Sequence, residues 1–193
     1  LLEIVSEPDL REPAEAVVFL KALQALVRYL GASDGNMEEG SLRCDANVSV
    51  RSRGAEALGA KVEIKNMNSF RAVERALAHE AARQREALGR GETVSQETRL
   101  YDETEGVTRP MRGKEDAHDY RYFPEPDLPV FTADEDWLGP LRKSLPELPL
   151  ARQARFVADY GLPPYDAEVL TQDRALADWF EEAAGAGAPP KTA

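Results

Sequence analysis

Residues 41–51, SLRCDANVSVR, alternate polar and apolar side chains without a break. Successive side chains of a β-strand point to opposite faces, so this period of two predicts a strand with one buried and one exposed face. Residues 60–66, AKVEIKN, repeat the pattern after a turn-like RGAEALG. We expect the two segments to pair as an antiparallel ribbon through a longer hairpin connection.

Apolar residues at three- and four-residue spacing predict two helices beside this ribbon. The first covers residues 13–30, with Pro13 in its first turn and Gly31 as its stop signal. The second covers residues 69–88, with Asn68 as the expected N-cap. Its predicted apolar stripe consists of Phe70, Val73, Leu77, Ala81 and Leu88. A second strand pair is expected around a turn at Glu105 and Gly106.

The pattern changes near residue 134, where short helical segments punctuated by proline begin. We therefore predict two parts, an α+β domain over residues 1–133 and a small all-α segment over residues 134–193. The expected fold class is α+β, with an antiparallel sheet backed by helices.

Composition limits the function classes. The single Cys44 excludes an internal disulfide framework, so a metal would need oxygen or histidine ligands. A net charge of -11 argues against general affinity for DNA or other nucleic acid, and any RNA contact should be local. No apolar run approaches the roughly 18 residues that span a membrane, and no secretory signal is present, so we expect a cytoplasmic protein. The chain starts without Met, and we expect it to be an internal piece of a longer protein.

The polar face of the predicted ribbon mixes two acids with cations. Its members are Arg43, Asp45, Asn47, Lys61, Glu63 and Lys65. Mg²⁺ binds oxygen ligands, usually one or two carboxylates completed by water and phosphate, and the cations could neutralise that phosphate. The alternative is a solvated sheet face whose opposite charges pair across the strands.

Two further groups of residues have open interpretations. Arginine and lysine residues that could bind phosphate, or form only a surface patch, are Arg99, Arg109, Arg112 and Lys114. In the run DYRYFPEPD, Tyr120, Arg121 and Tyr122 could stack on an unpaired nucleotide at an RNA end, or belong to a packed loop.

Cys44 lies on the apolar face, which favours an inert thiol, and both histidines, His79 and His118, are expected to be solvated. The chain has no GxxxxGK[ST] or GxGxxG motif.

Six ordered motifs carry a family resemblance: LLEIVSEPD, MEEGSLRCDANVSVR, EIKNMNSFRAVE, QETRLYDE, HDYRYFPEPDLP and ELPLARQARFVADYGLPPYDAEVLT. Together they resemble the GatB/GatE family, the B and E subunits of tRNA-dependent amidotransferases. The resemblance implies the C-terminal half of a glutamine synthetase-like catalytic cradle, followed by the start of a helical domain. It also implies an ATP- and Mg²⁺-dependent reaction that converts the side-chain carboxylate of Glu-tRNA(Gln) or Asp-tRNA(Asn) into an acyl phosphate and then an amide. Implied partners are a glutaminase A subunit, which supplies ammonia, and a small C subunit.

The resemblance assigns roles to individual residues. Asp45 of RCDAN and Glu63 of EIKN match the magnesium-binding acids of the family. Residues expected to face phosphate as catalytic groups are Arg43, Lys65 and Arg99. Expected nucleotide contacts are Arg112 and Lys114, and expected contacts to the tRNA end are Tyr120, Arg121 and Tyr122. The family's Glu-x-His motif, which supplies further metal ligands, does not occur in the sequence, so we expect this chain alone to be inactive.

Two other interpretations stay open. The chain could be a non-catalytic scaffold that docks the amidase partner, with a charged ribbon that serves solubility. It could also be an archaeal-type E subunit, although the inserted domain of that type is not found between residues 126 and 145.

Overall fold

A computed structural model describes residues 2–111 and 127–191. The chain divides into two compact units. The first is built from the residues up to Gln24 and those from Gly35 onward through the sheet, and the second contains Ala25–Asp34 and the C-terminal helices. Among the described residues, no helix is long and apolar enough to cross a membrane. The boundary expected at residue 134 stays a prediction.

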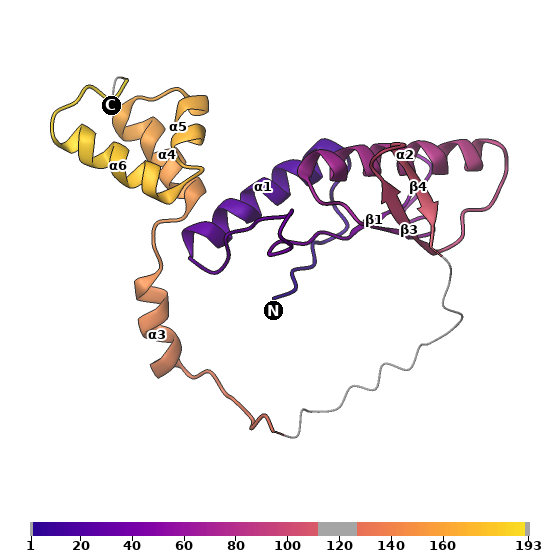
Figure 1. Cartoon of the computed structure of the whole chain (residues 1–193), viewed down its shortest axis with the longest axis horizontal. Helices are drawn as coiled ribbons and strands as arrows, with labels where there is room; N and C mark the ends of the chain where they lie inside the picture. Colours follow the sequence, from indigo (N-terminus) through magenta and orange to yellow (C-terminus); the bar gives the residue numbers. More distant parts are fainter. Residues whose placement is uncertain (1, 112–126, 192–193) are drawn as a thin grey trace. The chain divides into compact units, whose positions relative to one another are not determined.

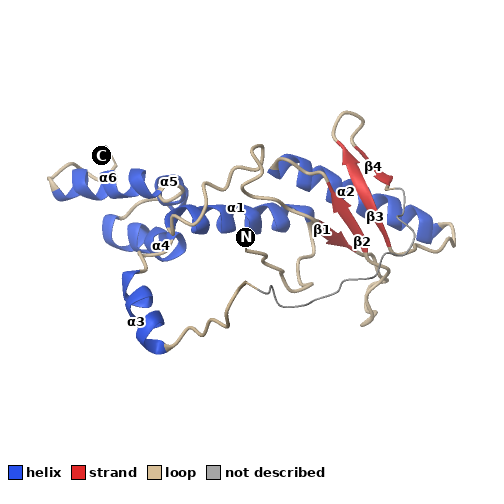
Figure 2. Ribbon diagram, turned by 60° about the horizontal axis from the view of Figure 1, so that its bottom comes forward, coloured by secondary structure: helices blue, strands red, loops and turns tan. Residues whose placement is uncertain are grey.

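The first unit (Figure 1) contains a four-stranded sheet in the order β1-β2-β3-β4 (Figure 2). The strands are β1 (Ala46–Val48), β2 (Val62–Lys65), β3 (Glu97–Asp102) and β4 (Val107–Pro110). The pairs β1–β2 and β3–β4 are antiparallel, as predicted. The central pair β2–β3 is parallel, so the expectation of a wholly antiparallel sheet was wrong in this detail. The α+β class is confirmed.

Helix α2 (Phe70–Gly89) makes the parallel pairing possible because it carries the chain from β2 back to the start of β3. Its N-cap is Ser69, whose hydroxyl oxygen accepts a hydrogen bond from the Ala72 N–H at 3.1 Å. The cap predicted at Asn68 was therefore one residue early. The helix lies along one face of the sheet (Figure 2).

The core of the first unit lies between α2 and the sheet. Strand residues that alternate toward the helix are fully buried, as Val62 and Ile64 show, while Glu63 and Lys65, which alternate with them, are only half-buried. Residues from α1 (Pro13–Tyr29), the turn after β2, α2 and β3 complete this core: Leu20, Met67, Ala72, Val73, Ala76 and Tyr101. The opposite face of the sheet keeps the polar residues of the alternating pattern.

The second unit contains the short helices α3 (Glu135–Ser144), α4 (Pro149–Tyr160), α5 (Pro164–Leu170) and α6 (Arg174–Gly185). Helix α3 has no buried residue. The last three helices share a core of Phe156, Leu162, Ala167, Ala177 and Phe180. The rings of Phe156 and Phe180 lie 4.9 Å apart, within the range that stabilises aromatic pairs.

Candidate metal and phosphate site

Asp45 and Glu63 lie on the same side of the sheet and converge on one ammonium group. The Lys65 Nζ atom is 2.5 Å from Asp45 Oδ2 and 3.1 Å from Glu63 Oε1. Because both carboxylates contact the same nitrogen, they are close enough to contact one cation together. About a third of the Lys65 and Glu63 side chains and half of the Asp45 side chain remain exposed, so this cluster is open to solvent.

The register of the strands explains this convergence. Asn47 is paired with Glu63 and Ala46 with Ile64, so Asp45 lies just before β1 and opposite the end of β2. Exposure alternates along residues 42–48, as the sequence predicted, although the regular strand covers only Ala46–Val48. The period of two therefore puts Asp45 and Glu63 on the exposed face.

The charge of Lys65 is stabilised by its two neighbours. Its hydrogen bond to Asp45 is the largest cause that raises the pKa of Lys65 above its usual range, and Glu63 adds to this effect. The lysine therefore stays protonated at neutral pH and occupies a position between two anionic oxygens.

A hollow of about 300 Å³ opens beside Asp45. It is lined by residues 37–40, by Leu42, Arg43 and Cys44, and by the turn Asn66, Met67 and Asn68 after β2. Asn66 adopts a positive φ of 69°, which asparagine tolerates better than most residues, and its amide donates to the Tyr101 carbonyl oxygen. The guanidinium of Arg43 contacts the Gly40 carbonyl oxygen at 3.3 Å and is exposed at this hollow. Arg43 and Asp45 thus line one solvent-open space.

Arg99 does not join this group. It is paired in register with Ile64, so the pleat directs it to the helix-covered face, away from Asp45 and Glu63. Its side chain is 10% exposed. The expectation that Arg99 faces the same phosphate as Lys65 is therefore not met, because the two residues lie on opposite faces of the sheet.

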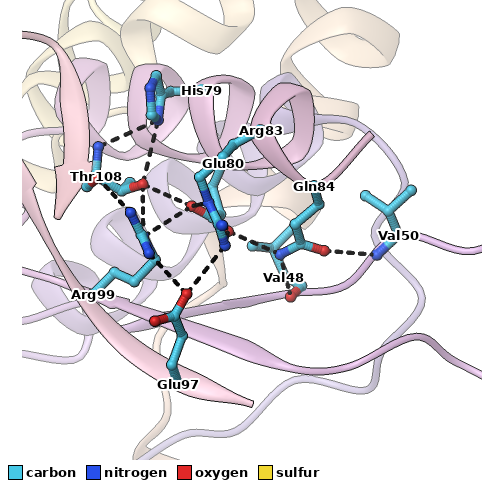
Figure 3. Close-up of polar contacts among 9 residues, drawn as sticks. All are labelled: Val48, Val50, His79, Glu80, Arg83, Gln84, Glu97, Arg99 and Thr108. Atoms are coloured by element: carbon cyan, nitrogen blue, oxygen red, sulfur yellow. Dashed lines mark hydrogen bonds and ion pairs between the residues drawn. The ribbon is translucent and has the colours of Figure 1, made fainter. Parts of the chain in front are cut away.

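Instead, Arg99 belongs to a buried polar network centred on Glu80 of α2 (Figure 3). Arg99 Nε lies 3.4 Å from Glu80 Oε2 and Arg99 Nη1 lies 2.8 Å from Glu97 Oε1. The carboxylate of Glu80 also accepts hydrogen bonds from three side chains: Arg83, Gln84 and Thr108. Burial alone would raise the pKa of Glu80, but the hydrogen bonds from these partners outweigh it and lower the pKa below its usual value.

The same network reaches both edge strands of the sheet, β1 and β4. The side-chain amide of Gln84 donates to the Val48 carbonyl oxygen, and its oxygen accepts the Val50 N–H. On the other side, His79 Nδ1 accepts the backbone N–H of Thr108 at 3.2 Å (Figure 3). The prediction of a solvated His79 missed this contact. Hydrogen bonds thus hold helix α2 against β1 and β4.

The remaining candidates divide into described and undescribed residues. Arg109 is exposed on β4, where it pairs with Asp102 at 3.3 Å. Burial raises the pKa of Cys44 to about 11, in agreement with an inert thiol. Five predicted site residues and one histidine lie outside the described residues: Arg112, Lys114, His118, Tyr120, Arg121 and Tyr122.

The two carboxylates suit a hard divalent cation that is completed by other ligands. Within residues 2–111 and 127–191, no group of three or more His, Cys, Asp or Glu side chains could hold a metal ion. Magnesium sites commonly use only one or two protein carboxylates, with water and substrate phosphate as further ligands. The convergence of Asp45 and Glu63 on a cationic nitrogen shows that this place accommodates positive charge.

The fold and the pair Asp45 and Glu63 define a class of protein, an α+β domain with a charged face of the sheet that is open to solvent. A family model described as GatB/GatE catalytic domain matches residues 1–139, and the chain belongs to this family. The predicted resemblance is thereby confirmed.

Curated relatives carry a more specific name, the B subunit of aspartyl/glutamyl-tRNA(Asn/Gln) amidotransferase. Those from Thermodesulfovibrio yellowstonii and Carboxydothermus hydrogenoformans are 56% and 59% identical over 191 residues, 99% of this chain. The protein of the same name from Salinibacter ruber is 62% identical over 183 residues, 95% of this chain and 36% of the relative. The chain spans about 40% of the length of the first two relatives.

Proposed function

We propose that this chain is part of the subunit that amidates a carboxylate carried on transfer RNA. In this reaction, an oxygen of the Glu or Asp side chain on the mischarged tRNA attacks the terminal phosphorus of ATP, and ADP leaves. Ammonia then attacks the acyl carbon of the acyl phosphate and phosphate leaves, which gives Gln-tRNA(Gln) or Asn-tRNA(Asn). Membership of the GatB/GatE catalytic-domain family and the names of the relatives support the proposal.

The observation that carries the proposal is the convergence of Asp45 and Glu63 on one cationic group, the Lys65 ammonium, at an exposed face of the sheet. A carboxylate becomes reactive toward ammonia only after phosphorylation, and the protein's part in phosphoryl transfer is mainly positioning and charge stabilisation. When bound, Mg²⁺ would neutralise phosphate charge at this place. Asp45 and Glu63 would hold the ion, and the ammonium of Lys65 and the guanidinium of Arg43 would contact phosphate oxygens.

The proposal includes partners and cofactors beyond this chain. ATP and Mg²⁺ would be the cofactors, a glutaminase A subunit would supply ammonia, and a small C subunit would complete the complex. Arg112 and Lys114 remain predicted nucleotide contacts, and Tyr120, Arg121 and Tyr122 remain predicted contacts to the tRNA end. We assign the activity to the cytoplasm because translation takes place there.

The test uses the full-length protein with its partners, the glutaminase blocked, and ammonium chloride as nitrogen donor. Amidation of mischarged tRNA is measured as a function of Mg²⁺ concentration for the wild type, Asp45→Asn and Glu63→Gln. Hydroxylamine is added in a parallel assay because it traps an acyl phosphate as a hydroxamate. Glu56→Gln is the matched control, since Glu56 is exposed in the connection between β1 and β2.

We expect the wild type and Glu56→Gln to amidate and to form ATP-dependent hydroxamate. Asp45→Asn and Glu63→Gln should each need at least tenfold more Mg²⁺ or lose amidation. Unchanged Mg²⁺ titrations in both variants would overturn the metal assignment. Absence of amidation with free ammonia in the wild type would favour the scaffold interpretation.

A further inference from the structure

Thr98 of β3 lies beside the proposed metal pair, although no motif pointed to it. It is paired in parallel register with Glu63, so both side chains lie on the exposed face. The Thr98 hydroxyl donates a hydrogen bond of 3.0 Å to Glu63 Oε2. Thr98 is half-buried, so its hydroxyl lies at the solvent-accessible face of the sheet.

The two oxygens of Glu63 have different partners. Oε2 accepts from Thr98, whereas Oε1 contacts Lys65 Nζ at 3.1 Å. A carboxylate with one oxygen engaged by a fixed donor loses rotational freedom about its last side-chain bond. Its second oxygen is thereby directed toward the space that Asp45 also faces.

The backbone on either side of Thr98 is held from the opposite face. Glu97 accepts from Arg99 at 2.8 Å, and Arg99 reaches Glu80 and Thr108 in the buried network (Figure 3). Because neighbouring residues of a strand point to opposite faces, anchoring Glu97 and Arg99 below the sheet fixes where Thr98 projects above it. The hydroxyl is therefore presented to Glu63 from a restrained strand.

We propose that Thr98 is a positioning residue for the metal-binding carboxylate of Glu63. Its hydroxyl holds the carboxylate so that Oε1, once the Lys65 ammonium moves aside toward phosphate, meets one divalent cation together with the Asp45 carboxylate. Groups that hydrogen-bond to a metal ligand commonly change metal affinity about 10- to 100-fold when they are removed. The inference rests on the proposed function, because it assumes that Glu63 is a metal ligand.

The test measures Mn²⁺ binding to the full-length protein by electron paramagnetic resonance of the free ion, without substrates. Variants are Thr98→Val, which keeps the branched shape but removes the hydroxyl, and Thr98→Ser, which keeps the hydroxyl. Thr104→Val is the matched control, since Thr104 is exposed in the β3–β4 turn. Glu63→Gln reports separately on the proposed function, and circular dichroism checks the folding of each variant.

We expect Thr98→Val to weaken Mn²⁺ binding about tenfold, Thr98→Ser to stay within about twofold of the wild type, and Thr104→Val to match it. Should Thr98→Val unfold, Thr98→Ala takes its place. Wild-type affinity in the folded hydroxyl-free variant, with weakened binding in Glu63→Gln, would overturn the positioning role alone. Equal weakening in Thr98→Ser and Thr98→Val would also overturn it. Unchanged binding in Glu63→Gln would overturn the metal role of Glu63, and this inference with it.

Discussion

Replacing Glu80 by Gln should destabilise the first unit more than any exposed charge change. The carboxylate is fully buried and lies 3.4 Å from Arg99 Nε and 2.6 Å from Arg83 Nη2. Gln is nearly isosteric but uncharged, so the variant leaves Arg99 with a single counterion, Glu97. Breaking a buried ion pair costs about 3–5 kcal/mol, and the remaining Glu97 contact places the expected loss at the lower end, about 3 kcal/mol.

Hydrogen exchange followed by mass spectrometry can measure this loss in the full-length protein. Amides of α2 and β3 should exchange about 100-fold faster in Glu80→Gln, since each 1.4 kcal/mol corresponds to about a tenfold change in the opening equilibrium. Glu86→Gln on the same helix is the control, because Glu86 is 75% exposed and its contact with Arg90 is long, 3.7 Å. Equal protection of α2 in the two variants would refute the reasoning that the buried network stabilises this unit.

Two further predictions concern stability. The pKa of Glu80 lies below its usual value in the folded chain, so the unfolded chain binds the proton more tightly and stability should fall as the pH drops below about 4.5. As the pH falls from about 6 to about 3, the urea midpoint of Glu80→Gln should decline less steeply than that of the wild type. Equal slopes of midpoint against pH in the two proteins would contradict this. Gly59→Ala should destabilise by about 1–3 kcal/mol, because the new Cβ would meet the Val50 carbonyl oxygen at 2.2 Å, whereas Gly89→Ala meets nothing within 4 Å and should stabilise slightly. Similar urea midpoints for the two glycine variants would show that the close approach at Gly59 relaxes freely.

The positions of the exposed site residues could be predicted because they follow a strict rule. Side chains alternate along a strand, and the pairing of β1 with β2 is local, so the common side of Asp45, Glu63 and Lys65 was evident from the spacing. Burial of Val62 and Ile64 follows from the same alternation. The first helix also begins at Pro13, as its sequence signals indicate.

The buried network could not be predicted from apolar periodicity. The inner stripe of α2 contains Glu80 and Gln84, which a hydrophobic pattern assigns to solvent, whereas Leu88 of the predicted stripe is 44% exposed. Only a compensating set of partners makes such burial favourable, and several of them, such as Arg99 and Thr108, come from strands distant in sequence. Burial of Arg99 and the role of Thr98 depend on the parallel pairing of β2 with β3, which no short-range pattern reveals.

Consecutive side chains of β3 lie on alternate faces of the sheet, as Glu97, Thr98 and Arg99 show. This alternation limits which insertions and deletions the gene can tolerate. Deleting or adding one codon within β3 would exchange the two sides, so that a guanidinium would emerge beside Glu63 and a hydroxyl would face Glu80. Length changes should therefore accumulate in the connection at residues 90–96, where a longer loop costs little, and be purged from the strand itself.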